Sequence, residues 1–242
     1  MPTRVLVRPA WLVIAVFFIG CLPIIGRADR VEPKHETVVL LHGMGRTRAA
    51  MMILAWRFEK AGYETLNFPY GQKSSSLNEI SDALTVFLEK NVRTPRYHFI
   101  GHSLGNIIVR NALRKSVRPG LGRIVMLAPP NRAAHLAKLF KDNRLYRWIM
   151  GDSGQRLADD EFYKTLPAPA VEFGVIAGDR GQSLTFDEPN DGIVAVATTR
   201  LEGMKAFVIV HHTHTLLVNT KDAFLLSKRF LESGSFEEKV EK

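Results

Sequence analysis

The chain has 242 residues, of which 46% are hydrophobic and 24% are charged, and its formal net charge is +9. This length favours one sizeable domain over two domains with separate cores, and the composition excludes a disordered or fibrous protein. The basic residues are scattered and follow no known reader motif, so nucleic-acid binding is not expected, whereas the moderate positive charge suits an anionic substrate or association with a membrane surface.

The first 28 residues have the layout of a signal peptide. Arg4 and Arg8 precede an uncharged stretch over 10–26, and the small residues Gly26 and Ala28 suit a peptidase that cuts before residue 29. The alternative is a retained N-terminal membrane anchor, although a proline interrupts the stretch and a spanning helix needs roughly 20 apolar residues. The protein is therefore expected to be exported to the periplasm or the medium, or to stay anchored through this segment.

Cys21 is the only cysteine of the chain. It follows Gly20 and so also suggests a lipoprotein signal, but the residues after it remain apolar, which argues against that interpretation. Cleavage after residue 28 would leave no cysteine, so no internal disulfide would stabilise the mature chain. It would also lower the net charge by three, because three arginines and no acidic residue would leave.

Strands and helices are predicted to alternate after a polar linker over 31–36. A continuous apolar, β-branched run at 37–41 predicts a strand that is buried on both faces of a parallel sheet. Further strands are predicted at 63–68, 97–100, 122–128, 171–177 and 205–210, with helices at 47–61, 78–90, 104–115 and 222–231. We therefore expect one α/β domain over 37–236, with about six mostly parallel strands and helices on both faces. Over 131–170 the pattern loosens into short basic pieces near 136–140 and 145–149, which predicts a small cap or excursion.

The strongest motif is Gly-His-Ser-Leu-Gly at 101–105, between a predicted strand and a predicted helix. This setting is the one that a nucleophile elbow requires, because the serine occupies a strained turn and the flanking glycines avoid collisions with neighbouring elements. An ordinary strand-to-helix turn with an N-capping serine would have the same local pattern. We interpret Ser103 as a catalytic nucleophile.

A nucleophilic serine needs a base to take its proton and an acid to orient that base, and the expected chain order is serine, acid, histidine. Asp191 is the preferred acid, since it lies in the loop after a predicted strand, where a carboxylate can reach the serine's end of the sheet. Asp179 and Asp187 lie in the same loop and remain alternatives. Arg180 offers Asp179 a simple ion pair, which makes Asp179 the weaker candidate.

The base is expected among three histidines that follow the last predicted strand. His214 is the preferred base, and His211 and His212 are interpreted as loop or strand-end residues. Three histidines this close also suggest a metal site, but neither a carboxylate nor a cysteine stands near them at a familiar ligand spacing.

Negative charge that develops on a substrate carbonyl oxygen needs donors, which backbone amides can supply. One candidate is the amide of Leu104, next to the nucleophile at the start of a helix. The other is the amide of Met44, in the glycine-punctuated turn after the first strand. These two amides are the predicted oxyanion hole.

Several segments resemble a bacterial, lipase-like branch of the α/β-hydrolase family, over residues 37–236. The resemblance rests on 38–46, the elbow at 101–105, 125–131, 174–178, 190–192, 214–217 and 230–236. It implies a three-layer α/β-hydrolase fold without the first antiparallel hairpin, and it implies Ser103, Asp191 and His214 as the catalytic triad. Many lipases that are similar to this chain carry glycine where Asn106 stands, so the packing behind the elbow is expected to differ.

The predicted activity is hydrolysis of carboxylic esters, of the lipase or esterase type, through an acyl-enzyme. Export and a modest apolar cap suit a small-molecule or lipid ester that is met outside the cytoplasm. No cofactor is expected, because the triad and the backbone amides supply the chemistry. An acyltransferase or an amidase would use the same triad, and a catalytically silent binding protein would keep the same fold.

Overall fold

The computed structural model describes residues 31–72, 75–115, 118–132 and 152–238. The predictions for the first 28 residues and for the helical pieces near 136–140 and 145–149 lie outside these ranges. Within them, no helix has the length and apolar character that crossing a lipid bilayer requires.

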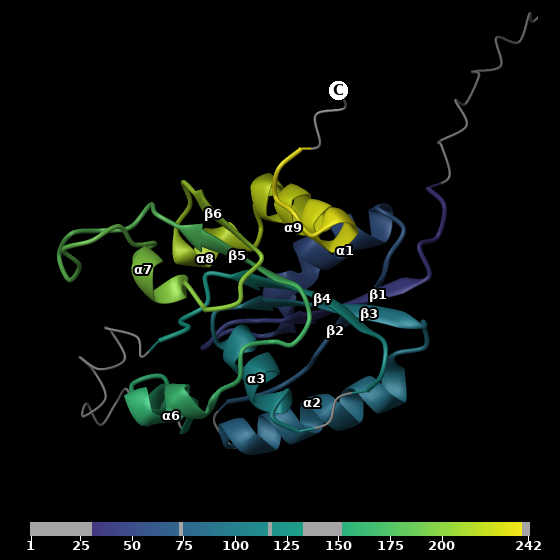
Figure 1. Ribbon diagram of the computed structural model, residues 1–242, viewed down its shortest axis with the longest axis horizontal. Helices are drawn as coiled ribbons and strands as arrows, with labels where there is room; N and C mark the ends of the chain where they lie inside the picture. Colours follow the sequence, from purple (N-terminus) through teal and green to yellow (C-terminus); the bar gives the residue numbers. More distant parts are fainter. Residues whose placement is uncertain (1–30, 73–74, 116–117, 133–151, 239–242) are drawn as a thin grey trace, which may run out of the picture. The chain divides into compact units, whose positions relative to one another are not determined.

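Six parallel strands form a single sheet in the order β2-β1-β3-β4-β5-β6 (Figure 1). The strands are β1 (Glu36–Leu41), β2 (Glu64–Asn67), β3 (Arg96–His102), β4 (Leu121–Leu127), β5 (Phe173–Gly178) and β6 (Ala206–Val210). The prediction of about six mostly parallel strands is confirmed. The strand order reverses between β1 and β3, where the register sets Leu41 beside Gly101. In sheets of this kind, ligands usually bind outside the carboxyl ends of the strands, at the point where the strand order reverses.

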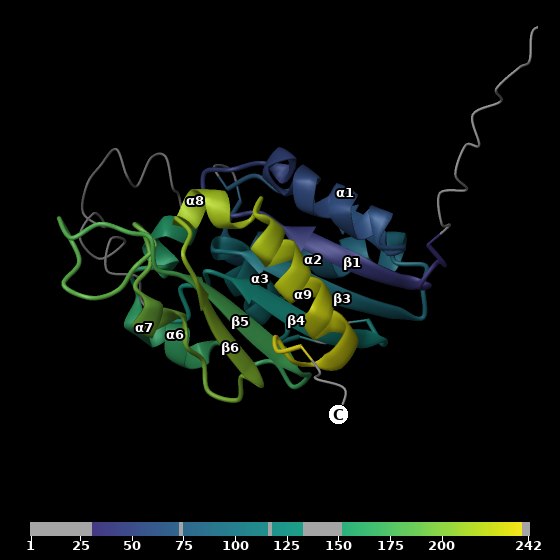
Figure 2. The ribbon, with the colours of Figure 1, turned by 90° about the horizontal axis from the view of Figure 1, so that it is seen from above.

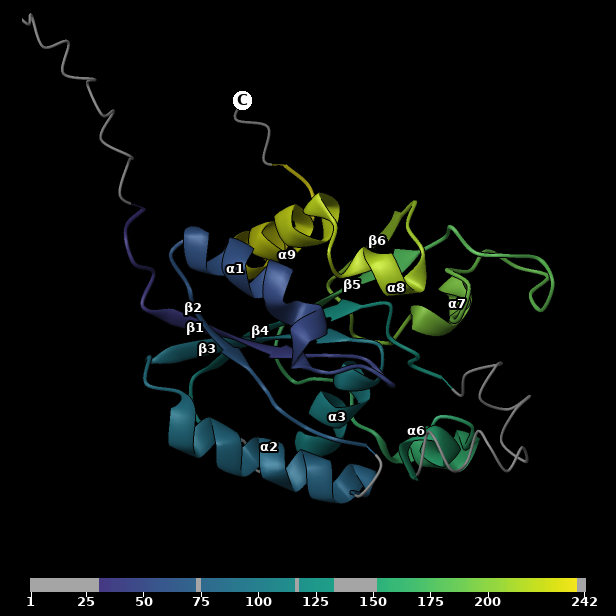
Figure 3. The same cartoon turned by 180° about the vertical axis from the view of Figure 1, so that it is seen from behind.

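Helices cover both faces of the sheet, as predicted. Helices α2 (Leu77–Asn91) and α3 (Leu104–Ala112) lie on one face, and α1 (Met52–Lys60) and α9 (Lys221–Ser233) lie on the other (Figures 1 and 3). The view from above shows α1 and α9 over the same face (Figure 2). Each face therefore has its own apolar cluster, and strand residues alternate between the two clusters.

Helix α2 shows how the sequence sets an element locally. Ser76 caps its first turn, because its hydroxyl accepts the Glu79 amide while the Glu79 carboxylate accepts the Ser76 amide. Leucines at 77, 84 and 88 and an isoleucine at 80 form its buried stripe. Helical spacing thus turns one face of α2 onto the sheet.

The structure adds short helices that the hydrophobic pattern did not predict. The first turn of the predicted helix at 47–61 is the 3₁₀ helix η1 (Arg48–Met51). Other short helices include α6 (Asp160–Thr165), α7 (Val196–Thr199) and α8 (His214–Leu217). Each spans fewer than two turns, which is too short for a helical period to emerge. Helix α6 belongs to the predicted cap, and Phe162 and Tyr163 place it against the α2 and α3 layer.

Arg110 is a buried cation on α3, only 2% exposed. Its guanidinium donates to the carbonyl oxygens of Leu166 (2.9 Å) and Pro167 (3.0 Å) and to Oδ1 of Asn131 (3.1 Å). None of these acceptors is charged, and burial lowers the pKa of Arg110 to about 10. The helix that follows the elbow is thereby connected to the segment after α6 and to the loop after β4.

Candidate active site

Ser103 lies between β3 and α3 in a strained backbone conformation. Its φ is 52° and its ψ is −120°, which a residue with a side chain rarely adopts and which costs on the order of 1–3 kcal/mol. The Ser103 amide donates to the Leu127 carbonyl on β4 (2.9 Å), which holds the turn against the sheet. Strain of this kind at the end of a central strand is typical of functional positions.

The two glycines of the motif let the neighbouring segments approach closely. A Cβ on Gly105 would lie 2.5 Å from the carbonyl oxygen of Leu41, at the end of β1. A Cβ on Gly101 would lie 2.4 Å from Oδ1 of Asn106. A side chain at either position would therefore push α3 away from the sheet and open the turn.

Asp191 and His214 form a buried pair. Nδ1 of His214 donates to Oδ2 of Asp191 over 2.7 Å, and the His214 amide donates to the Asp191 carbonyl over 2.9 Å. The two residues are 2% and 6% exposed. Because the carboxylate accepts at Nδ1, the neutral imidazole has its unprotonated nitrogen at Nε2, where it can take up a proton.

The loop after β5 fixes the orientation of the Asp191 carboxylate. Its Oδ1 accepts the amides of Ile193 (3.0 Å) and Val194 (2.8 Å), which leaves Oδ2 for the imidazole. Gly192 supplies the left-handed conformation of this turn, with φ of 99°. The Asn-Asp-Gly sequence thus builds a local turn whose acidic side chain faces His214.

His102 connects the elbow to His214, the predicted base, a contact that the sequence did not reveal. Its Nε2 donates to the carbonyl oxygen of His214 over 3.0 Å, and the two rings lie 4.8 Å apart. Burial, and then the proximity of His214, hold the pKa of His102 well below its usual range. A neutral His102 therefore keeps Ser103 and His214 on adjacent segments without adding a positive charge beside His214.

The turn after β1 packs directly against the elbow. A Cβ on Gly43 would lie 3.2 Å from the Cβ of Ser103 and 2.9 Å from Nδ1 of His102, so only glycine allows this approach. Met44 follows and is half-buried. Tyr70 supports the turn from the next loop, since its ring stacks on His42 at 3.9 Å and its hydroxyl donates to the His42 carbonyl.

The predicted site residues all stand at the carboxyl ends of strands. Met44 follows β1, Ser103 and Leu104 follow β3, Asp191 follows β5, and His214 follows β6. Parallel strands deliver their carboxyl ends to one edge of the sheet. The structure thus gathers at one edge residues that are up to 170 positions apart in sequence.

The alternative acids and histidines form other pairs. His211 contacts Asp179 over 2.9 Å, and His212 contacts Asp222 over 2.8 Å. Asp179 therefore pairs with a histidine rather than with the neighbouring arginine considered from the sequence. Asp187 lines a surface hollow of about 500 Å³ in the same loop.

The structure bears on two other kinds of site, a metal site and a second serine. Among the residues that it describes, no three His, Cys, Asp or Glu side chains gather closely enough to hold a metal ion. Ser153, in the sequence Gly-Asp-Ser-Gly at 151–154, is fully buried in the helical turn at 152–156.

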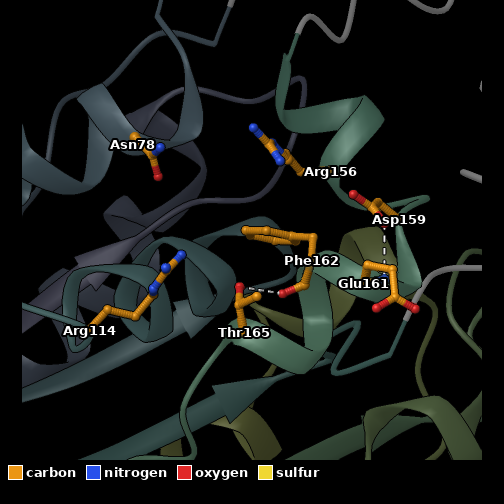
Figure 4. A pocket seen from close by; sticks show the side chains of 7 residues that line it. All are labelled: Asn78, Arg114, Arg156, Asp159, Glu161, Phe162 and Thr165. Carbon is orange, nitrogen blue, oxygen red and sulfur yellow. Dashed lines mark hydrogen bonds between the residues drawn. The ribbon is translucent and has the colours of Figure 1, made fainter.

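A hollow of about 300 Å³ lies beside α6 (Figure 4). Its lining comprises Asn78, Arg114, Arg156, Asp159, Glu161, Phe162 and Thr165. Several of these side chains make local contacts. Arg156 pairs with an aspartate one turn earlier, and Asp159 accepts the amide of Glu161 at the start of α6. The hollow has no paired nucleophile and base, so the edge of the sheet remains the candidate active site.

Three buried histidines predict loss of stability in mild acid. His42, His98 and His102 are at most 3% exposed, and burial lowers the pKa of each. His98 shows a second reason, because its Nδ1 already accepts the Arg123 amide (2.9 Å) and would lose this bond on protonation. The unfolded chain takes up protons near pH 6.5 and the folded chain does not. The free energy of unfolding should therefore hold above pH 6.5 and fall below it, by up to about 1.4 kcal/mol per pH unit for each histidine.

Urea unfolding at pH 8.0, 6.5 and 5.5 measures this effect. His98→Gln should reduce the slope between pH 6.5 and 5.5. Equal free energies of unfolding at pH 8.0 and 5.5 would contradict the prediction.

Solved structures share this fold at low sequence identity. A lipase of Bacillus licheniformis in its mature form is 18% identical, with a TM-score of 0.62 over 84% of this chain and 92% of the lipase. A metagenomic carboxyl esterase is 18% identical, with a TM-score of 0.61 over 80% of this chain and 69% of the esterase. An extracellular α/β-hydrolase of a Paenibacillus species is 14% identical, with a TM-score of 0.57 over 81% and 98% of the two chains. No protein-family model and no curated protein matches the sequence. The chain has the α/β-hydrolase fold, as its resemblance to that family implied.

Proposed function

We propose that this protein is an exported serine hydrolase that cleaves carboxylic esters through a Ser103, His214 and Asp191 triad. The observation that carries the proposal is the buried Asp191 and His214 pair, joined over 2.7 Å beside an elbow whose serine has φ of 52°. The fold shared with a lipase and a carboxyl esterase supports the ester as the substrate class. The signal-like first 28 residues and the extracellular similar hydrolase support export.

In the first half of the reaction, Oγ of Ser103 attacks the ester carbonyl carbon and its proton moves to Nε2 of His214. Asp191 stabilises the imidazolium at Nδ1, and the amides of Met44 and Leu104 hold the negative oxygen. Collapse of the tetrahedral intermediate breaks the bond to the alkoxy group, which takes the proton from His214 and leaves as the alcohol. The acyl group remains on Ser103.

In the second half, water takes the place of the alcohol. His214 accepts a proton from the water as its oxygen attacks the acyl-enzyme, and then returns that proton to Oγ of Ser103. The products are the carboxylic acid and the regenerated enzyme. No other group is needed, since both proton transfers use the same imidazole.

A chain-length series of p-nitrophenyl esters, with the matching p-nitroanilides, tests the substrate class. We expect the mature protein to hydrolyse at least one ester with kcat/KM at least about 100-fold above that for the anilide of the same acid, because an alcohol is a better leaving group than an amine. Preference for short or long acyl chains then separates an esterase from a lipase. Faster turnover of the anilides would indicate an amidase, and acyl transfer to added alcohols without hydrolysis would indicate an acyltransferase. Absence of any turnover would favour a silent binding protein.

A further inference from the structure

We propose that Gln72 and Asn106 are positioning residues that aim the two oxyanion-hole amides. This inference rests on the proposed function, since it assumes that the amides of Met44 and Leu104 bind the developing negative charge. It adds two side chains that are not members of the triad.

The geometry of the peptide group provides the first step. A trans peptide is planar, so the N–H of one residue points opposite to the carbonyl of the residue before it. The amide of Leu104 therefore shares a rigid unit with the carbonyl of Ser103, and the amide of Met44 shares one with the carbonyl of Gly43. A donor that binds either carbonyl oxygen therefore also restrains the direction of the N–H on the opposite side of the same peptide.

Asn106 holds the Ser103 carbonyl. Its Nδ2 donates to the carbonyl oxygens of Ser103 and Leu127, each over 3.2 Å, and its backbone amide donates to the Ser103 oxygen over 3.0 Å. The side chain is 1% exposed, so these bonds are made away from water. Asn106 thus ties the peptide of the elbow to β4.

Gln72 holds the Gly43 carbonyl together with His42, whose Nδ1 donates to the same oxygen over 2.9 Å. The Nε2 of Gln72 donates to that oxygen over 3.3 Å, and its Oε1 accepts the amide of Gly45 over 2.8 Å. One side-chain amide therefore bonds to the residues on both sides of Met44. Gln72 is 8% exposed and comes from the segment between β2 and α2, remote in sequence from the turn that it holds. It restrains rotation of the Met44 amide.

The same arrangement occurs twice at one site. Two side-chain amides from different segments each donate to the carbonyl of a peptide whose N–H faces the reacting oxygen. Preorganised donors act on charge that develops in the transition state, so loosening them should lower kcat more than it raises KM. Removal of a whole oxyanion donor costs about 10²–10³ in kcat, and misalignment of one should cost less, about 10-fold for each residue.

The test compares Gln72→Met and Asn106→Ala with Asn111→Ala. Asn111 is a buried amide on the same helix as Asn106, but its Nδ2 donates to Asn78 and Ser81 on α2, away from the site. Two rates are measured on the mature protein: labelling of Ser103 by a fluorophosphonate, whose phosphoryl oxygen also needs the oxyanion hole, and turnover of the best p-nitrophenyl ester. Thermal unfolding is followed in parallel. Gln72→Glu serves as the conservative variant, because it keeps the acceptor for Gly45 and removes the donor to Gly43.

We expect Gln72→Met and Asn106→Ala each to lower the labelling rate and kcat about 10-fold with little change in KM, while Asn111→Ala lowers thermal stability and leaves both rates unchanged. Gln72→Glu should label more slowly than the wild type. Wild-type rates in folded Gln72→Met, or an equal loss in Asn111→Ala, would overturn the inference and leave the proposed function intact. Gln72→Met decides the question alone if Asn106→Ala fails to fold. A wild-type protein that neither labels at Ser103 nor turns over any ester would overturn both.

Discussion

Ser103→Ala is expected to lower kcat for ester hydrolysis by about 10⁴- to 10⁶-fold and to abolish labelling by fluorophosphonates. The reason is that the acyl-enzyme requires an oxygen nucleophile at this turn, and alanine removes that oxygen alone. The remaining rate would come from substrate binding and from the two oxyanion amides. Mass spectrometry of the labelled peptide and steady-state kinetics measure the two effects.

Ser153→Ala is the matched control, because Ser153 also lies between glycines, in Gly-Asp-Ser-Gly at 151–154, and is fully buried. It should keep wild-type labelling, whatever its effect on stability. Circular dichroism should show that Ser103→Ala remains folded, since alanine retains the backbone bond to β4. Labelling that persists in Ser103→Ala would remove Ser103 as the nucleophile.

Asp191→Asn is expected to lower kcat by about 10⁴-fold while the fold is retained. The two backbone amides at Ile193 and Val194 require an acceptor, so the new side chain should turn its oxygen toward them and its NH₂ toward His214. The imidazole must then accept at Nδ1 and carry its proton on Nε2. In that tautomer it cannot take the proton of Ser103.

Asp179→Asn provides the control for this second prediction. Asp179 pairs with His211, whose side chain is 77% exposed, so its replacement should change kcat by less than about twofold. Steady-state kinetics of the two variants on one ester make the comparison. A large loss in Asp179→Asn with full activity in Asp191→Asn would assign the acid to Asp179 instead.

The sheet and its principal helices could be predicted because each carries a periodic signal in its own sequence. The apolar run at 37–41 and the buried stripe of α2 are local patterns, and both elements form where they were expected. Helices α6, α7 and α8 are shorter than two turns, so no period identifies them. Their positions depend on packing against elements that are distant in sequence.

Some residues of the candidate site could likewise be identified from the sequence, and others only from the structure. Ser103, Asp191 and His214 were selected by chain order and by the sequence around each, and the bond between the last two became visible only in three dimensions. Gln72 and Tyr70 lie in a loop without a motif, and their importance comes from long-range contacts with the turn after β1. His102 was seen as part of the elbow, but its bond to the His214 carbonyl spans 112 positions.

The buried guanidinium of Arg110 affects how the structure around α3 unfolds locally. If the segment after α6 moved away from α3, the Arg110 guanidinium would lose its bonds to the carbonyl oxygens of Leu166 and Pro167. Water could not replace these bonds at once, so the buried cation would be left without acceptors. Partial opening there carries a large penalty, so the amides of α3 should exchange with solvent hydrogen only when a wider region unfolds. Helix α3 and the segment after α6 would then behave as one cooperative unit.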